Sequence, residues 1–157
     1  MCSSDLETVL VLHGIVRTRY SMEDLAAHLR QAGYQAYSVG YPSTRADVER
    51  HARCLKSIVD GLPEASKIHF VGHSMGGLVI RAYLADPSSL RGERLGRMVM
   101  IGTPNHGAER ADALAGTFPF DQIFGPAGAQ LVTGPEGIAQ QLPKSPPLEF
   151  EIGRAHV

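Results

Sequence analysis

The stretch Lys67–Leu84 reads KIHFVGHSMGGLVIRAYL, and the architecture of the chain can be built around it. Its first part, Lys67–Val71, is a β-branched and aliphatic run that predicts a buried strand, and Met75–Leu84 predicts a helix that is apolar almost all round. Between them lies Gly72-His73-Ser74-Met75-Gly76-Gly77, a G-x-S-x-G pattern at a strand-to-helix turn. A serine there is exposed above the carboxyl edge of a sheet, beside the free N–H groups of a helix N-terminus. The pattern therefore predicts that Ser74 is a nucleophile.

Two glycines of this turn have a predicted steric role. A Cβ at Gly72 or Gly76 would clash where the strand and the helix close around Ser74, whose backbone is expected to be strained by about 1–3 kcal/mol. A glycine-rich turn that carries an incidental serine is the plainer alternative. A phosphate-binding loop fits worse, because the lysine of G-x-x-x-x-G-K-[ST] is absent.

A second functional element is expected after the run Thr8–Leu12, which predicts another buried strand and ends at His13-Gly14. Acyl transfer requires two N–H donors directed at the developing oxyanion. In a strand–turn–helix site of this kind, one donor is the residue after the nucleophile, Met75, and the other comes from the loop after this strand, most simply Ile15. Gly14 would let the backbone approach the substrate. Taken alone, His13-Gly14 would be an ordinary strand end.

The rest of the chain alternates between strands and helices. Two further helices are expected, one N-capped by Ser21 and closed by Gly33, the other opened by Thr44. Further strands are predicted at Gln35–Gly40, Arg97–Ile101 and Leu148–Ile152. Alternation at this spacing predicts an α/β fold, with a mostly parallel sheet and helices on both faces.

Residues 107–147 have no clear periodicity beyond a short helix expected near Ala108–Ala115, and we interpret them as a lid-like segment. Four apolar side chains in this segment are candidates for lining an acyl pocket, although plain packing is the commoner role. They are Phe118, Phe120, Ile123 and Phe124.

Composition narrows the functional classes. The chain has 157 residues, 43% of them hydrophobic and 20% charged, which fits one globular domain. Lys and Arg number 15 against 16 Asp and Glu, so the net charge of -1 argues against a nucleic-acid partner. The cysteines, Cys2 and Cys54, are too few for a disulfide framework, and no ligand spacing indicates a metal or a cofactor. No signal peptide or membrane span is evident, so the cytoplasm is the default expectation.

Three stretches together resemble the α/β-hydrolase superfamily, and within it the small lipase- and esterase-like members. They are VLVLHGIVRT (Val9–Thr18), HFVGHSMGGLVIRAYL (His69–Leu84) and MVMIGTPNHG (Met98–Gly107). The resemblance implies a sheet with the order 4-3-5-6-7 in the family's strand numbering. Ser74 and the Ile15 loop would then follow neighbouring strands at the topological switch point.

The resemblance also implies an activity. It is that of a serine esterase or lipase acting on small-molecule carboxylic esters, with lipid-like acyl groups, through Ser74 and an oxyanion hole of the Ile15 and Met75 N–H groups. A thioesterase, amidase or acyltransferase would use the same site. The alternative from another class is a non-catalytic binding protein of the same fold, although such a protein has no need of a strained nucleophile.

Both ends of the chain look like translated library adapter. Written as GTG TGC TCT TCC GAT CT, residues 1–6 have a reverse complement that reads Ile-Gly-Arg-Ala-His, which is the sequence of residues 152–156. We therefore expect adapter-like tails at residues 1–6 and 152–157 around a partial, C-terminally truncated α/β-hydrolase domain at 7–151. In the superfamily the triad acid and then the His follow the serine. Both are expected beyond this C-terminus, which would leave the chain as given inactive.

The histidines within the domain are expected to have supporting roles. His73 flanks the nucleophile but is expected to point away from it, and His106 is expected to be structural. His28 and His51 are expected to be solvated or half-buried on helices, and His69, which lies in a strand, is expected to be satisfied in the core.

Overall fold

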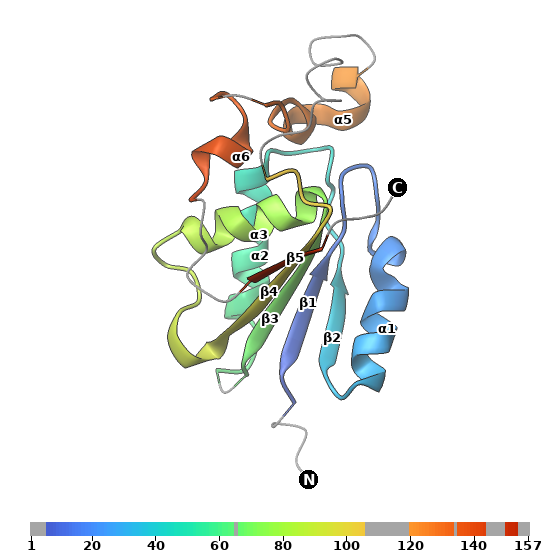
Figure 1. The fold of residues 1–157 in the computed structure, drawn as a ribbon, viewed down its shortest axis with the longest axis vertical. Helices are drawn as coiled ribbons and strands as arrows, with labels where there is room; N and C mark the ends of the chain where they lie inside the picture. Colours follow the sequence, from blue (N-terminus) through green and yellow to red (C-terminus); the bar gives the residue numbers. More distant parts are fainter. Residues whose placement is uncertain (1–5, 65, 106–119, 134, 144–149, 154–157) are drawn as a thin grey trace.

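In the computed structural model, residues 6–64, 66–105, 120–133, 135–143 and 150–153 are described. Five parallel strands form one sheet in the order β2-β1-β3-β4-β5 (Figure 1). The strands are β1 (Thr8–Leu12), β2 (Gln35–Val39), β3 (Ile68–His73), β4 (Leu95–Ile101) and β5 (Phe150–Gly153). In the family's numbering this order is 4-3-5-6-7, so the predicted fold class and strand order are confirmed. Strand β5 includes the first two residues of the expected C-terminal tail.

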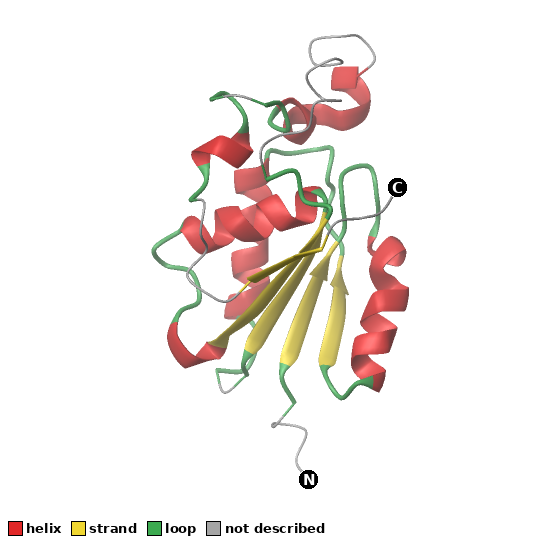
Figure 2. Cartoon of the chain, viewed as in Figure 1, coloured by secondary structure: helices red, strands yellow, loops and turns green. Residues whose placement is uncertain are grey.

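Helices cover both faces of the sheet (Figure 2). Helix α1 (Glu23–Gln31) lies on one face, and α2 (Val48–Asp60) and α3 (Met75–Ala85) lie on the other. Because successive side chains of a strand point to opposite faces, β1 supplies both cores. Leu10 and Leu12 join the core beneath α2 and α3, whereas Val9 and Val11 join the core beneath α1.

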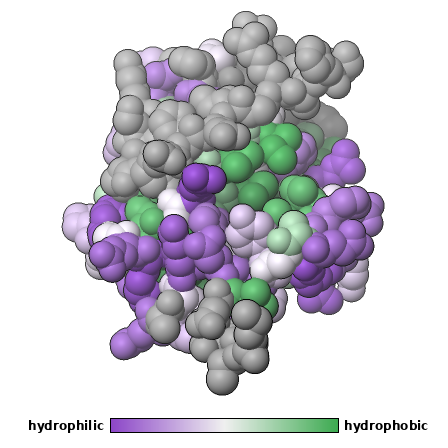
Figure 3. Space-filling model, turned by 60° about the horizontal axis from the view of Figure 1, so that its bottom comes forward, coloured by the Kyte–Doolittle hydropathy of each residue, from purple (hydrophilic) through white to green (hydrophobic). Residues whose placement is uncertain are grey.

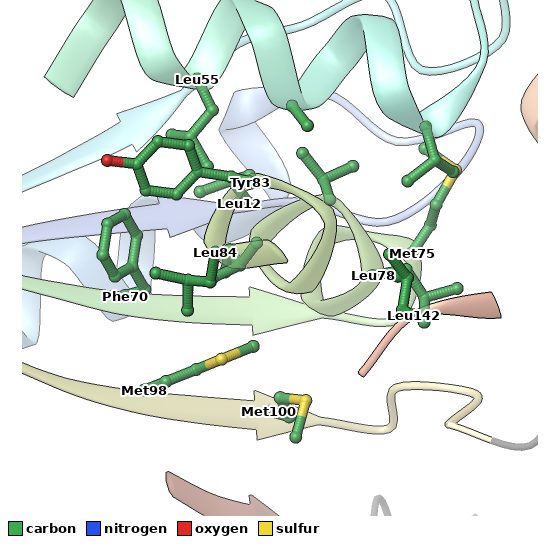
Figure 4. Close-up of a cluster of buried hydrophobic side chains, with 14 of the residues drawn as sticks. Leu12, Leu55, Phe70, Met75, Leu78, Tyr83, Leu84, Met98, Met100 and Leu142 are labelled. Carbon is green, nitrogen blue, oxygen red and sulfur yellow. The ribbon is translucent and has the colours of Figure 1, made fainter. Parts of the chain in front are cut away.

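The larger core is built around α3, whose side chains are buried on nearly every side (Figure 4). Tyr83 near its C-terminal end packs against Phe70 of β3, with ring centroids 5.7 Å apart. Met75 at its N-terminal end is fully buried as well. Burying a large apolar side chain contributes about 1.5–3 kcal/mol, so α3 is firmly anchored at both ends.

Two helix starts differ from the sequence-based expectation. Ser21 is not an N-cap, because Arg19–Met22 form a 3-10 turn in which the Ser21 hydroxyl donates to the Thr18 carbonyl at 2.8 Å. Helix α2 begins at Val48 rather than at Thr44. Asp47 caps it, since its carboxylate accepts a hydrogen bond from the Arg50 N–H at 2.7 Å and is favoured by the helix dipole.

Part of the expected lid-like segment is described, as α5 (Phe120–Ala129) and α6 (Ile138–Gln141). Helix α5 is broken at Gly125, which has a φ of 62° and passes so close to Thr44 that a Cβ would lie 1.7 Å from the Thr44 carbonyl oxygen. Gln130 fastens the segment to the N-terminus of α2: it accepts from the Val48 N–H and donates to the Glu49 carboxylate, both at 2.8 Å. The short helix expected near residues 108–115 lies outside the described residues.

A further 3-10 turn, Gly92–Arg94, leads into β4.

On the face shown in Figure 3, apolar surface gathers in one area among largely polar side chains. The large apolar side chains that are exposed come from separate elements, as is common on protein surfaces. They are Leu6, Val16, Tyr20, Tyr37, Ile58 and Ile123. None of the described helices combines the length and the apolar character needed to cross a membrane.

Candidate active site

Ser74 joins the last residue of β3 to the first residue of α3. Its backbone has a φ of 54° and a ψ of -125°, the conformation of the first central residue of a type II′ turn, which glycine normally occupies. A side chain held in such a region costs about 1–3 kcal/mol. The turn is fastened to the neighbouring strand, because the Ser74 N–H donates to the Ile101 carbonyl at 2.8 Å.

The glycines around Ser74 are sterically required. A Cβ on Gly72 would lie 2.5 Å from the Gly77 nitrogen, and one on Gly76 would lie 2.6 Å from the Leu12 carbonyl oxygen. A third glycine, which the sequence interpretation did not single out, is also tightly packed: a Cβ on Gly77 would lie 2.0 Å from the Thr103 hydroxyl oxygen. The N-terminus of α3 therefore backs directly onto the end of β1.

The loop after β1 lies beside Ser74. A Cβ on Gly14 would be only 3.0 Å from the Ser74 Cβ and 3.2 Å from His73 Nδ1. The next residue, Ile15, is half-buried against the larger core. Among the described residues, neither the Ile15 N–H nor the Met75 N–H donates to a protein acceptor. The structure thus places Met75 directly after the serine, as the first residue of α3, and places Gly14, the neighbour of Ile15, against the serine from the other side.

One histidine prediction is wrong. His51, expected to be solvated or half-buried, is 2% exposed, because it lies on the buried face of α2 with Val48 and Ala52 and packs against the Tyr41 ring. His69 is satisfied, as expected, although it is half-buried rather than in the core: its Nε2 donates to the Glu7 carboxylate and its Nδ1 accepts from the Arg97 N–H, both at 2.9 Å. His28 is exposed.

His73 is half-buried, and burial together with the nearby Arg17 charge lowers its pKa. None of the five histidines in the described ranges makes a hydrogen bond to the Ser74 hydroxyl. His106 lies outside those ranges, so its expected structural role stays a prediction.

The acyl-pocket candidates are only partly described. Ile123 is half-exposed and Phe124 packs against the larger core, whereas Phe118 and the side chain of Phe120 lie outside the described residues. A cavity of about 410 Å³ lies between α2, α3 and α6, lined by Arg53, Tyr83, Leu142 and others. It is next to the C-terminal end of α3 and includes neither Ser74 nor the loop after β1, so it does not serve as the acyl site.

The sequence interpretation missed a buried cation on α3. Arg81 is 5% exposed, and its guanidinium donates to the Asn105 side chain at 3.1 Å. It also donates to three carbonyls, of Ala139, Leu142 and Pro143, at 3.2, 3.3 and 3.0 Å. Burial lowers its pKa. An arginine inside the apolar run VIRAYL was the signal available for this contact.

Within the described ranges, no group of three His, Cys, Asp or Glu side chains gathers that could hold a metal ion. Cys54 is an exposed free thiol on α2.

Residues 7–142 match the model of the family described as alpha/beta hydrolase fold. No curated protein matches the sequence. Among solved structures, the fold is similar to the mature form of the lipase BlEst2 from Bacillus licheniformis, with a TM-score of 0.74 and 19% identity, covering 94% of this chain and 64% of that one.

Two other similar structures are a phospholipase and an esterase. Phospholipase PlaB from Legionella pneumophila, in complex with thio-NAD, has a TM-score of 0.69 and 21% identity, covering 86% of this chain and 32% of that one. The metagenomic carboxyl esterase MGS0156 has a TM-score of 0.63 and 19% identity, with 90% and 43% of the two chains covered. The chain thus spans less than two thirds of these structures' lengths, and identities this low establish the fold alone.

Proposed function

The chain belongs to the alpha/beta hydrolase fold family, and on that basis we propose that it is part of a serine hydrolase that cleaves carboxylic esters. Ser74 is the nucleophile, and the Ile15 and Met75 N–H groups form the oxyanion hole. The substrates are small-molecule esters with apolar, lipid-like acyl groups. The lipase, phospholipase and esterase among the similar folds support this choice over amide or thioester chemistry.

The observation that carries the proposal is the backbone of Ser74. A non-glycine residue held at a φ of 54° with glycines packed around it is a strained arrangement. Strain of this kind persists where the surroundings over-determine it, and it is concentrated at functional sites. A hydrolase-fold protein that only binds ligands would gain nothing from holding a serine in this conformation.

The proposed reaction uses the groups in a fixed order. The Ser74 hydroxyl oxygen attacks the ester carbonyl, and the resulting oxyanion accepts hydrogen bonds from the Ile15 and Met75 N–H groups. The intermediate collapses, the alcohol leaves with a proton, and water then hydrolyses the acyl-serine ester to the acid. The base that takes the Ser74 proton is proposed to come from residues outside the described part of the chain.

A fluorophosphonate probe tests the proposal. In the full-length protein, the probe should label the wild type and should not label Ser74→Ala, and the wild type should hydrolyse p-nitrophenyl butyrate. A folded wild type that is neither labelled nor active would instead support the non-catalytic binding protein.

A further inference from the structure

Among the described residues, two non-glycine residues have a positive φ, and both lie at the candidate site. One is Ser74, and the other is Val16, with a φ of 58°. A β-branched residue in this region is a marked outlier, because its Cβ branches crowd the backbone. Val16 immediately follows the proposed oxyanion donor Ile15. Something must therefore hold this loop in a conformation that its own residues resist.

The Gly14–Ile15 peptide is fixed from one side. The Gly14 carbonyl accepts hydrogen bonds from His13 Nδ1 at 2.8 Å and from the Arg17 N–H at 3.3 Å. In a trans peptide the N–H points opposite to the carbonyl, and the described chain contains no cis peptide. Holding the Gly14 oxygen therefore also aims the Ile15 N–H.

The segment after β2 holds the other side of this loop. The Ser43 hydroxyl, 4% exposed, accepts a hydrogen bond from the Val16 N–H at 3.1 Å. The Tyr41 hydroxyl donates to the His13 carbonyl, and the Tyr41 N–H donates to His13 Nε2 at 3.5 Å. The three bonds join residues 27 or 28 positions apart in the chain.

Ring stacking connects the segment after β2 to α2 as well as to His13. Tyr41 stacks on His13 with centroids 4.2 Å apart and planes inclined by 12°, and its other neighbour is the ring of buried His51 at 4.9 Å. His13 is wholly buried, and with Nδ1 donating to Gly14 its Nε2 is left as the acceptor that the Tyr41 N–H requires.

We infer that Tyr41 and Ser43 are positioning residues, which hold the loop of Gly14–Arg17 in the conformation that points the Ile15 N–H at the oxyanion. The inference rests on the proposed function. Neither residue touches the substrate; Tyr41 acts through His13, and Ser43 acts through Val16. Loss of either bond lets the strained loop relax, which weakens stabilisation of the transition state more than substrate binding.

The test measures kcat and KM for p-nitrophenyl butyrate in the full-length protein. Ser43→Ala and Tyr41→Phe should each lower kcat by about 10- to 100-fold, less than the ~10²–10³-fold of a donor removed outright, with little change in KM. Affinity for a trifluoromethyl ketone, which forms a tetrahedral adduct with the serine, should fall by a similar factor. Ser43→Thr, which keeps the acceptor oxygen, should restore most of kcat.

Matched controls separate positioning from stability. Tyr83→Phe removes another tyrosine bond, in which the Tyr83 hydroxyl accepts from the Leu90 N–H at 2.8 Å, and Ser57→Ala removes a hydroxyl from the exposed side of α2. Both should leave kcat unchanged, even where Tyr83→Phe lowers the melting temperature. Ser43→Ala and Tyr41→Phe variants that melt earlier but keep wild-type kcat would overturn the inference.

A double variant covers the case in which Ser43→Ala folds poorly. Glycine takes a φ of 58° without strain, so Val16→Gly should recover part of the kcat lost in Ser43→Ala, and the two changes should not be additive. Additive losses would contradict the inference. A wild type that neither hydrolyses the ester nor takes the fluorophosphonate probe at Ser74 overturns the proposed function, and with it this role. An active wild type with unaffected variants overturns the positioning role alone.

Discussion

The two loops that meet at Ser74 are held in place by different means. The turn between β3 and α3 is fixed by backbone packing, since Gly72 and Gly76 come so close to neighbouring main chain that no Cβ fits. The loop after β1 is fixed by side chains, from Tyr41 and Ser43 beyond β2. Backbone packing makes the first loop part of the folded core. Side-chain contacts make the second one adjustable without unfolding the core.

The largest effect is expected at the serine itself. Ser74→Ala should reduce ester hydrolysis by the full-length protein to background, a loss of roughly 10⁶-fold, because loss of the nucleophile costs about as much as loss of a whole triad. Rates with p-nitrophenyl butyrate measure it, and circular dichroism checks that the variant is folded. Retention of most of the activity would exclude Ser74 as the nucleophile.

Gly14 tests the second loop. Gly14→Val should lower kcat by about 10²–10³-fold, because its Cβ would press on the Ser74 Cβ at 3.0 Å and displace the Ile15 N–H. The folding midpoint should change little, since the loop is not part of the backbone-packed core. Steady-state kinetics and thermal melting of the same preparation give both readings. A variant that loses stability but keeps kcat would show that Gly14 is only structural.

Gly72 tests the first loop and should behave in the opposite way. Gly72→Ala places a Cβ 2.5 Å from the Gly77 nitrogen, which is main chain and cannot rotate away. Overpacking of this kind costs about 1–3 kcal/mol or more, so the free energy of unfolding should fall. Urea denaturation measures the loss. Gly33→Ala, where nothing lies within 4 Å of the new Cβ, provides a comparison in which only the φ of 95° is strained.

The smallest expected effect concerns pH. Burial lowers the pKa of both His13 and His51, which stand behind the second loop. The unfolded chain therefore binds more protons, so stability is full above the unfolded value of 6.5 and is lost as the pH falls below it. Each group contributes a slope of at most about 1.4 kcal/mol per pH unit.

Urea unfolding of the full-length protein between pH 7.5 and 5.5 would measure this slope. His51→Gln should make the loss on acidification shallower than it is in the wild type. An unchanged slope in His51→Gln would mean that this histidine is already protonated in the folded protein or remains accessible to water.

The difference between backbone packing at the Ser74 turn and side-chain contacts at the loop after β1 also explains which parts of the site could be predicted from the sequence. The turn at Ser74 and the strands beside it were predictable, because glycine spacing and apolar runs are local signals. The contacts that Tyr41 and Ser43 make with the loop after β1 were not predictable, because nothing in the residues around them indicates contact with a loop 27 positions earlier. Helix α2 illustrates a smaller failure: both Thr44 and Asp47 are suitable caps, and only packing selects Asp47 and buries His51.

Arg81 ties α6 to α3, and this contact affects how α6 can open. Its guanidinium has carbonyl and amide oxygens as acceptors, and no carboxylate pairs with it among the described residues. Lifting α6 away would break the Arg81 bonds to the Ala139 and Leu142 carbonyls and would expose the buried apolar side chains of this segment. Hydrogen bonds to a charged group contribute about 1.5–3 kcal/mol each, which adds to the cost of that exposure. Local opening there is therefore suppressed, and the amides of residues 138–142 should exchange with solvent hydrogen only when α3 itself unfolds. In exchange experiments, α6 would behave as part of the same cooperative unit as α3, despite being only four residues long.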